Sequence, residues 1–240
     1  PTPAKPIGIA ILGCGRISGH HARAIGRLPE HGRVVVVADQ DAARAAALAA
    51  AHGIGATAPD LDAVLARRDV DAVLVCTPNA LHADQSIRIL ESGRDVLVEK
   101  PFAENAADAE RMAECAARTG RVLALGQTLR HTQPIRWLQD HRHDFGRLRA
   151  VEVSMLVRWN GPQAPWWKTR TRREGLILSL YAPHALDFVQ LVLGPVDAQH
   201  VHAEVARWQS DWDSEDEAMI LLRYPGGVLA QVHISYNQRF

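Results

Sequence analysis

The 240-residue sequence has few cysteines, few aromatic residues and no net charge. Its three cysteines, Cys14, Cys76 and Cys115, lie far apart, and no two have the spacing of a metal-binding pair. Such usage is typical of a reduced cytoplasmic protein, and the first residues show no apolar secretory segment. Equal numbers of basic and acidic residues, 27 of each, predict no general attraction to nucleic acid or to an anionic membrane. No apolar run approaches the roughly 20 residues that a membrane-spanning helix needs.

The first half of the sequence alternates apolar strand patterns with helical patterns. Continuous apolar runs predict strands at residues 7–12, 34–38, 72–76, 95–98 and 122–125. Alanine-rich helical stretches separate them, and glycines at 53, 93 and 120 are expected to end three of the helices. Strands that alternate with helices indicate an α/β fold with a doubly wound parallel sheet, which we expect over residues 1–126.

The pattern changes after residue 126. Long strand patterns cover residues 147–159, 197–208, 216–224 and 226–236, and one helix pattern covers residues 182–194. Tyr224-Pro225-Gly226-Gly227 reads as a hairpin turn between the last two strands. We therefore expect a second, α+β domain with a mainly antiparallel sheet over residues 127–240.

Two glycines interrupt the sequence directly after the first predicted strand. In "ILGCGRIS", Gly13, Gly15 and Ser18 approximate the G-x-G-x-x-G pattern. The first position needs a residue without Cβ for a tight turn, the second lets the backbone approach a pyrophosphate, and the third must be small. The amides that open the following helix would then face the phosphates. A tight strand–helix turn without a ligand is the alternative interpretation.

The end of the second predicted strand indicates which dinucleotide is preferred. Asp39 can accept hydrogen bonds from ribose hydroxyls, and its charge would repel a 2′-phosphate. The neighbouring sequence "ADQD" offers no arginine for such a phosphate. The sequence therefore predicts that NAD is the cofactor and that NADP is disfavoured.

Four segments, "ILGCGRIS", "VCTPNALHAD", "VLVEKPFAEN" and "GQTLRHTQPIRWL", together resemble the glucose–fructose oxidoreductase/inositol dehydrogenase (Gfo/Idh/MocA) family. The resemblance runs over residues 7–240, and the Glu-Lys-Pro triplet is its most specific mark. It implies a Rossmann domain, a sheet-based second domain, and NAD(P)-dependent oxidation or reduction of hydroxyl groups on sugars, inositols or related polyols. The cofactor-binding residues that it implies are Gly13, Gly15, Arg16, Ile17, Asp39, Thr77, Pro78, Asn79, His82, Glu99 and Lys100. For His82, a purely structural role at the start of a helix is the alternative.

Lys100 is the first candidate catalytic residue. Hydride transfer from a carbinol carbon requires removal of the hydroxyl proton, so a base or a cation near that hydroxyl lowers the barrier. The resemblance implies that Lys100 lies beside the nicotinamide and that the peptide before Pro101 is often cis. An exposed lysine at a strand end is the alternative.

His184 is the second candidate catalytic residue, and it also belongs to the predicted substrate site. The family pattern G-G-x-x-x-D-x-G-x-H-x-x-D corresponds here to "GLILSLYAPHALD", in which Gly175, His184 and Asp187 match. Leu180 stands where the family usually has Asp, and Ala182 where it has Gly. The missing carboxylate could impair proton transfer, reroute it through Tyr181 or water, or abolish it. A packing histidine is the alternative for His184.

Further candidates for substrate contact are Arg130, Tyr181, Trp166 and Trp167. Arg130 matches a family arginine at the domain junction, although it could equally form an ion pair. The tryptophans lie in "RWNGPQAPWWKTRTRREG", where indoles could stack on a sugar ring and arginines could bind an acidic or phosphorylated substrate. The same segment could instead pack in an oligomer interface.

The remaining features concern metals, partners and an alternative function. His-x-His pairs at 141/143 and 200/202 have no evident third ligand, so we predict no metal site. Family members continue beyond the fourth long strand, and uncovered strand edges tend to pair, so we expect a homo-oligomer, a dimer or a tetramer. Leu180 and the early end of the sequence favour a second interpretation, a non-catalytic NAD-binding sensor or scaffold. Lys100 and His184 favour the oxidoreductase.

Overall fold

The computed structural model describes residues 5–158, 176–209 and 212–238. The chain divides into two compact units, Pro1–Gly126 and Gln127–Phe240, and each has its own sheet. Trp159, Trp166, Trp167 and Gly175, together with the basic residues between Trp167 and Gly175, lie outside the described residues. None of the described helices is both long and apolar enough to cross a membrane.

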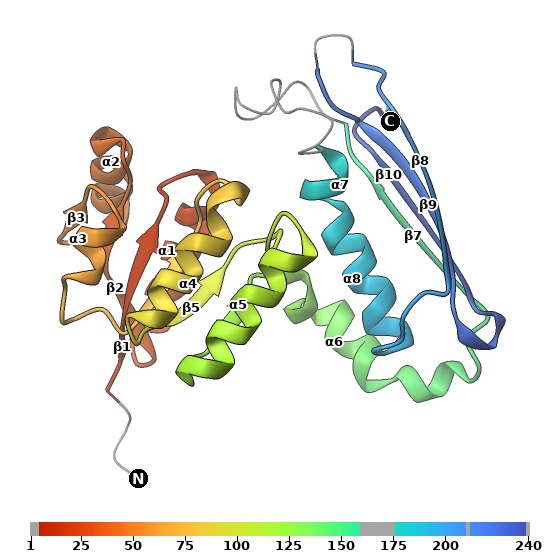
Figure 1. Ribbon diagram of the computed structural model, residues 1–240, viewed down its shortest axis with the longest axis horizontal. Coiled ribbons are helices and arrows are strands. Elements are labelled where there is room, and N and C mark those ends of the chain that lie inside the picture. The colour runs from red at the N-terminus through yellow and green to blue at the C-terminus, as the bar shows by residue number, and fades with distance from the viewer. Residues whose placement is uncertain (1–4, 159–175, 210–211, 239–240) are drawn as a thin grey trace. The chain divides into compact units, whose positions relative to one another are not determined.

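The first unit is a parallel sheet of six strands with helices in the connections (Figure 1). The strands are β1 (Ile7–Leu12), β2 (Gly32–Ala38), β3 (Thr57–Ala58), β4 (Ala72–Val75), β5 (Asp95–Val98) and β6 (Leu123–Leu125). Their order in the sheet, β3-β2-β1-β4-β5-β6, reverses between β1 and β4, which confirms the doubly wound sheet. The helices are α1 (Arg16–Gly26), α2 (Ala42–His52), α3 (Leu61–Leu65), α4 (His82–Glu91) and α5 (Ala106–Thr119). The sequence did not predict β3, because two residues are too few to give a strand pattern.

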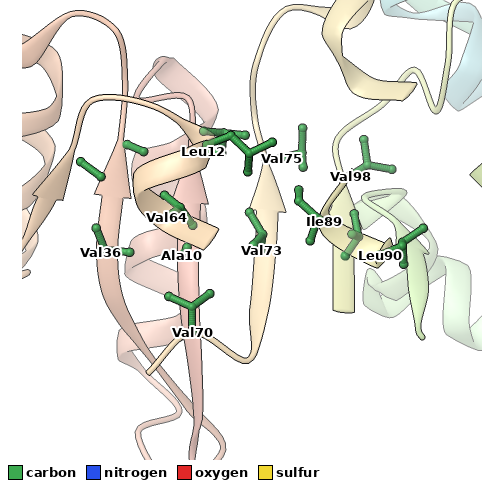
Figure 2. Close-up of a cluster of buried hydrophobic side chains, with 14 of the residues drawn as sticks. Ala10, Leu12, Val36, Val64, Val70, Val73, Val75, Ile89, Leu90 and Val98 are labelled. Carbon is green, nitrogen blue, oxygen red and sulfur yellow. The ribbon is translucent and has the colours of Figure 1, made fainter. Parts of the chain in front are cut away.

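The apolar runs of the sequence form the core of this sheet. Ala10 and Leu12 from β1, Val73 and Val75 from β4, and Val98 from β5 are buried in one cluster (Figure 2). The other face of β1 buries Ile11 against a second cluster, so the strand has apolar neighbours on both sides. Burial on both faces is the reason that these strands are continuously apolar rather than alternating.

Local signals end the helices where the sequence predicts. Helix α2 begins after Asp41, whose carboxylate accepts the amides of Ala43 and Arg44, and it ends at Gly53 with φ +64°. Helix α5 ends in the same left-handed conformation at Gly120, with φ +63°. Gly93 also has a positive φ after α4, so the three predicted glycine stops are confirmed.

The second unit is a sheet of four strands covered on one face by a helix (Figure 1). Its strands are β7 (Ala150–Leu156), β8 (His200–Ala206), β9 (Glu217–Arg223) and β10 (Leu229–Ser235), in the order β7-β10-β9-β8. The helices are α6 (Gln133–Asp140), α7 (Ile177–Leu180) and α8 (Ala182–Leu193). Short 3₁₀ turns, η1 (Asn79–Leu81) in the first unit and η2 (Thr128–His131), η3 (Arg142–Phe145) and η5 (Pro225–Gly227) in the second, complete the elements.

The second sheet is mixed rather than antiparallel throughout. Strand β9 pairs antiparallel with both β8 and β10, and η5 forms the turn between β9 and β10. Strand β7, however, runs parallel to β10, because the chain reaches β10 only after α8 and two further strands. The sequence also predicted one helix here, whereas α6 and α7 are additional. Both are short, with eight and four residues, so each offers too few positions for its pattern to stand out in the sequence.

One face of this sheet packs against α8, and the other face is exposed. Ile220, Val232 and Ile234 point toward α8 and are buried. On the opposite face, Met219 and Leu221 of β9 are 50% and 52% exposed. The alternation along β9 is therefore that of a strand with one covered and one uncovered face.

Candidate functional site

The glycine turn lies at the carboxyl end of β1, where doubly wound sheets bind their ligands. Gly13 has φ +93°, and a Cβ there would lie 2.6 Å from the carbonyl oxygen of Cys76, so no other residue fits without displacing backbone. Gly15 differs, because no described heavy atom lies within 4 Å of the place its Cβ would take. Gly13 thus permits the close approach of β1 and β4, whereas Gly15 leaves an open space before α1.

The third position of the motif faces the interior. Ser18 is fully buried, and its hydroxyl donates to the carbonyl oxygen of Gly15, which fixes the start of α1. Arg16 and Ile17 precede it and are exposed in the first helical turn. Among the described residues, no side chain caps the amino end of α1.

Asp39 lies directly after β2 and contacts the glycine turn. Its Oδ2 accepts a hydrogen bond from the backbone amide of Cys14 at 2.8 Å, and its Oδ1 accepts one from the backbone amide of Asp41 at 2.9 Å. Burial, together with the Asp39 carboxylate, raises the pKa of the Cys14 thiol to about 11. Cys14 is therefore a neutral thiol at pH 7, and the carboxylate is the negative group beside the open space.

The Thr77-Pro78-Asn79 turn follows β4 at the same edge of the sheet. Thr77 Oγ1 donates to Oε1 of Gln85 at 2.6 Å. Asn79 is buried, and its Nδ2 has no hydrogen-bond partner among the described residues. A buried amide donor without an acceptor is costly, so it marks a place where a ligand oxygen would be favourable.

His82 connects this turn to the segment after β5. It is the first residue of α4 and only 1% exposed. Its Nδ1 lies 2.8 Å from the carbonyl oxygen of Pro101, and its Nε2 lies 3.0 Å from that of Thr77. His82 therefore starts the helix and also holds two backbone segments together.

Glu99 and Lys100 follow β5. Glu99 is 7% exposed; its Oε1 lies 2.7 Å from Nε2 of His21, and its Oε2 accepts the amide of Lys100 at 3.1 Å. Burial opposes ionisation of Glu99, but the hydrogen bonds and charges of His21 and Lys100 outweigh it and hold its pKa below the usual range. The carboxylate is thus ionised, so His21 Nε2 carries the proton of their hydrogen bond.

Lys100 is partly buried rather than an exposed strand-end lysine. Burial lowers the pKa of its ammonium, Glu99 partly opposes this effect, and Arg16 adds to it. The peptide bond between Lys100 and Pro101 is cis, as the family resemblance led us to expect. A lysine with a lowered pKa at the ligand-binding edge of a parallel sheet has the properties of a proton-transfer group.

His184 lies in the second unit, in the first turn of α8, where Gln127 orients it. Nδ1 of His184 is 2.7 Å from Oε1 of Gln127, whose Nε2 donates to the carbonyl oxygen of Pro183 at 2.9 Å. A carbonyl oxygen only accepts, so the amide nitrogen must face Pro183 and the amide oxygen must face the imidazole. Nδ1 of His184 therefore carries a proton, and in the neutral ring Nε2 is the basic nitrogen.

Arg130 forms a two-point ion pair with Asp187 of α8. Its Nε lies 2.8 Å from Oδ2, and its Nη2 lies 2.6 Å from Oδ1. The hydrogen bonds to Asp187 raise the pKa of Arg130. Arg130 thus forms the ion pair that the sequence offered as one of its two interpretations, and Asp187 balances its charge.

Leu180 is the last residue of α7 and is 6% exposed. It packs in the apolar cluster that includes Ile177 and Val189, so a leucine suits its surroundings. Tyr181 follows it and contacts the ring of Tyr236 edge to face, with ring centres 5.1 Å apart. Trp166 and Trp167 cannot be placed, since they lie outside the described residues.

The sequence did not single out His21 or Gln127. His21 lies three residues after Ser18, on the buried side of α1, and this spacing is the only local signal it gives. Gln127 gives none, because its role depends on α8. Within the described ranges, no group of three or more His, Cys, Asp or Glu side chains could hold a metal ion.

Two family models match the chain. The model of an oxidoreductase family with an NAD-binding Rossmann fold, GFO_IDH_MocA, matches residues 7–127, and that of the GFO/IDH/MocA C-terminal domain matches residues 141–240. The chain belongs to the Gfo/Idh/MocA family. The family resemblance of the sequence is therefore confirmed, and so is the Rossmann unit followed by a second sheet.

Individual Gfo/Idh/MocA relatives are moderately similar. The chain is 30% identical over 211 residues to 1,5-anhydro-D-fructose reductase of Ensifer adhaerens, covering 87% of this chain and 63% of that protein. It is 33% identical over 190 residues to inositol 2-dehydrogenase of Rhizobium meliloti (strain 1021), covering 77% and 54%. The crystal structure of the WlbA dehydrogenase from Bordetella pertussis, in complex with NADH and UDP-GlcNAcA, is 28% identical, with a TM-score of 0.86, and covers 97% and 73%. The chain thus spans less than two thirds of the length of these two curated relatives.

Proposed function

We propose that this chain is the NAD-binding and substrate-binding part of a dehydrogenase acting on a hydroxyl or carbonyl group of a sugar, an inositol or a related polyol. The observation that carries the proposal is the environment of Lys100. This lysine follows β5 at the edge where parallel sheets bind ligands, and burial there lowers its pKa. The named relatives support the substrate class: one reduces 1,5-anhydro-D-fructose, and another is an inositol 2-dehydrogenase.

The residues of the first unit fit NAD. The open space at Gly15, the uncapped amino end of α1 and the unpartnered Nδ2 of Asn79 would receive its polar groups. Asp39 would accept hydrogen bonds from the adenosine ribose and disfavour a 2′-phosphate. Arg16, Ile17, Thr77, Pro78, Glu99 and Lys100 complete the proposed cofactor-binding set, with His82 holding two of its segments together.

NAD would accept the hydride, and residues of the protein would transfer the proton of the substrate hydroxyl. We propose that deprotonated Lys100 takes the proton of the substrate hydroxyl, or that its ammonium donates it in the reverse direction. A lowered pKa increases the fraction of Lys100 that is neutral near pH 7, which favours the first role. His184, with its proton fixed on Nδ1, offers Nε2 as the second proton-transfer atom.

We assign residues 1–126 to cofactor binding and residues 127–240 to substrate binding and oligomerisation. His184 and Tyr181 are the described residues of the second unit that we propose to contact substrate. We also propose that Arg130 belongs to the substrate site, because it forms an ion pair with Asp187, which lies three residues after His184 on the same helix. Trp166 and Trp167 remain candidate stacking residues for a sugar-like substrate that could be acidic.

A non-catalytic NAD sensor or scaffold is the second candidate function. Leu180 favours it, because an apolar side chain packs where the family pattern has a carboxylate. The two functions differ in one measurement, the change in absorbance at 340 nm when the protein is mixed with NAD and a panel of sugars, inositols and sugar acids. Turnover on any member supports the dehydrogenase. NAD binding without turnover across the panel supports the sensor, and absence of NAD binding contradicts both.

A further inference from the structure

The segment that carries Lys100 is held at both of its flanks by histidines from different helices. On one side, His21 of α1 bonds to the carboxylate of Glu99 at 2.7 Å. On the other side, His82 of α4 contacts the carbonyl oxygen of Pro101 at 2.8 Å. The residues before and after Lys100 are therefore each tied to a helix that begins at the proposed cofactor site.

The contact on the Glu99 side is specific in its geometry. His21 and Glu99 are 78 residues apart in sequence, and both side chains are nearly buried, at 14% and 9% exposed. With Oε1 on His21, the other oxygen of Glu99 reaches the backbone amide of Lys100 at 3.1 Å. One carboxylate thus joins α1 to the peptide group of Lys100.

The space around this carboxylate admits few other positions. A Cβ at Gly126 would lie 3.2 Å from Oε1 of Glu99 and 3.3 Å from the carbonyl oxygen of Val98, which is tighter than ordinary contact. The glycine therefore leaves room for Oε1 of Glu99, the same oxygen that contacts His21. Released from His21, the carboxylate would be a buried charge with one hydrogen bond fewer, and it would turn toward another cation.

We propose that His21 is a positioning residue, which holds the Glu99 carboxylate so that the Lys100 backbone, and with it the Lys100 ammonium, keeps its place. The chemical purpose of that placement rests on the proposed function, in which Lys100 transfers the substrate proton. The placement itself does not depend on turnover and can be measured without it.

The composition of the chain makes Lys100 directly observable. The sequence contains only three lysines, Lys5, Lys100 and Lys168. Protein grown with lysine labelled with ¹³C at Cε gives three lysine signals, and the Lys100→Arg variant identifies the one from Lys100. Its titration with pH reports the surroundings of the ammonium, on which Glu99 and Arg16 act directly, while His21 and Cys76 lie near Glu99.

The decisive comparison uses two substitutions at His21 and one at its neighbour. His21→Leu keeps most of the volume and cannot donate a hydrogen bond, His21→Gln can still donate one, and His20→Leu alters the exposed adjacent residue of the same helix. In His21→Leu we expect the titration midpoint of Lys100 to rise toward that of an ordinary lysine, because the segment loosens into water and Glu99 is free to approach the ammonium. We expect His21→Gln to restore most of the wild-type midpoint and His20→Leu to leave it unchanged.

Two further variants separate positioning from general destabilisation. Gly126→Ala crowds Oε1 of Glu99, the atom that contacts His21, and should move the Lys100 midpoint while the His21 side chain itself is kept. The double variant His21→Leu/Glu99→Gln should match Glu99→Gln alone, since His21 acts only through that carboxylate. Gly126→Ala keeps the test open if His21→Leu does not fold. An unchanged midpoint in His21→Leu, or in Gly126→Ala when His21→Leu is unfolded, overturns the proposal.

Kinetics distinguish this inference from the proposed function. If the wild type turns over a polyol, His21→Leu should lower kcat about 10- to 100-fold with a smaller change in KM for the substrate, and His21→Gln should recover most of the loss. If the wild type turns over nothing while the Lys100 midpoint still responds to His21, the proposed function fails and the positioning role stands. If turnover is normal in His21→Leu with an unchanged midpoint, the positioning role fails and the function stands.

Discussion

Nδ1 of His184 lies 2.7 Å from Oε1 of Gln127, and this contact decides which ring nitrogen carries the proton. The family resemblance led us to expect a carboxylate four residues before the histidine, where this chain has Leu180. Gln127 supplies an alternative orienting group from a different element. Its amide is fixed in turn by the carbonyl oxygen of Pro183, so it cannot rotate to present a donor to the imidazole without losing that bond.

Replacing Gln127 with leucine should therefore disturb His184 selectively. We expect kcat for Gln127→Leu to fall about 10- to 100-fold with NAD affinity nearly unchanged, because the imidazole loses its fixed orientation. Nitrogen NMR of the ring should show mixed tautomers in place of a single Nδ1–H form. The control is Gln190→Leu, at an exposed glutamine of the helix that carries His184, and equal kinetic losses in both variants would contradict the assignment.

Removal of the Lys100 side chain tests the proposed proton acceptor. In Lys100→Ala we expect turnover to fall about 10²–10⁴-fold, the range for loss of a proton-transfer group, with a much smaller effect on the dissociation constant of NAD. Steady-state kinetics and a fluorescence titration measure the two quantities. Lys5→Ala is the matched control, and normal turnover by Lys100→Ala would remove Lys100 from the mechanism.

Asp39 should determine the preference for NAD over NADP. Asp39→Ser removes the charge that repels a 2′-phosphate. The ratio of the NADP dissociation constant to the NAD dissociation constant should therefore fall toward one. Asp39→Asn is the informative companion, because an amide oxygen can still accept the Cys14 amide that the carboxylate accepts at 2.8 Å. Both variants should lower this ratio if the charge of Asp39 causes the preference for NAD. Tighter binding of NADP than of NAD by the wild type would contradict the preference.

Leu180→Asp tests whether position 180 communicates with the proposed site. If the new carboxylate acts on Lys100, it stabilises the ammonium and raises its pKa, so the rise of rate with pH that follows deprotonation of Lys100 should move to higher pH. Because position 180 is buried among apolar side chains, the new Asp should also lower the free energy of unfolding by about 1–3 kcal/mol or more.

The control for this variant is Leu180→Asn, which is polar and similar in size but uncharged. A pH–rate profile and a melting curve for each protein separate charge from packing. Identical profiles in active wild type and Leu180→Asp would show that the position does not act on the site. If the wild type is the non-catalytic protein of the second candidate function, Leu180→Asp alone should not create hydride transfer.

The uncovered face of the second sheet should mediate the predicted homo-oligomer. Met219, Leu221 and Leu229 are each about half exposed on that face, at 50%, 52% and 55%. Light scattering should give the mass of a dimer or a tetramer, and Leu221→Arg should shift it toward the monomer because a charge would be buried in the interface. Leu28→Arg, at a similarly exposed leucine of the first unit, should leave the mass unchanged. A monomeric wild type at high concentration would contradict the oligomer.

Local patterns in the sequence were sufficient for the doubly wound sheet and for the position of the glycine turn. Strands buried on both faces must be apolar throughout, and Gly13 must lack a side chain because a Cβ would meet the Cys76 backbone. The motif segments around Asp39, Asn79 and Lys100 each follow a strand of one parallel sheet (β2, β4 and β5), so their common edge was predictable. The assignment to the Gfo/Idh/MocA family likewise needed only the sequence of these segments.

Only the tertiary structure decided which side chains act on one another. The pairs His21–Glu99 and Gln127–His184 are 78 and 57 residues apart and leave no periodic signal. Strand β3 and the parallel pairing of β7 with β10 also depend on neighbours brought together by the chain's path rather than on their own residues. Apolar periodicity determines local elements because each residue responds to burial on its own, whereas a hydrogen bond between distant side chains exists only once packing fixes both partners.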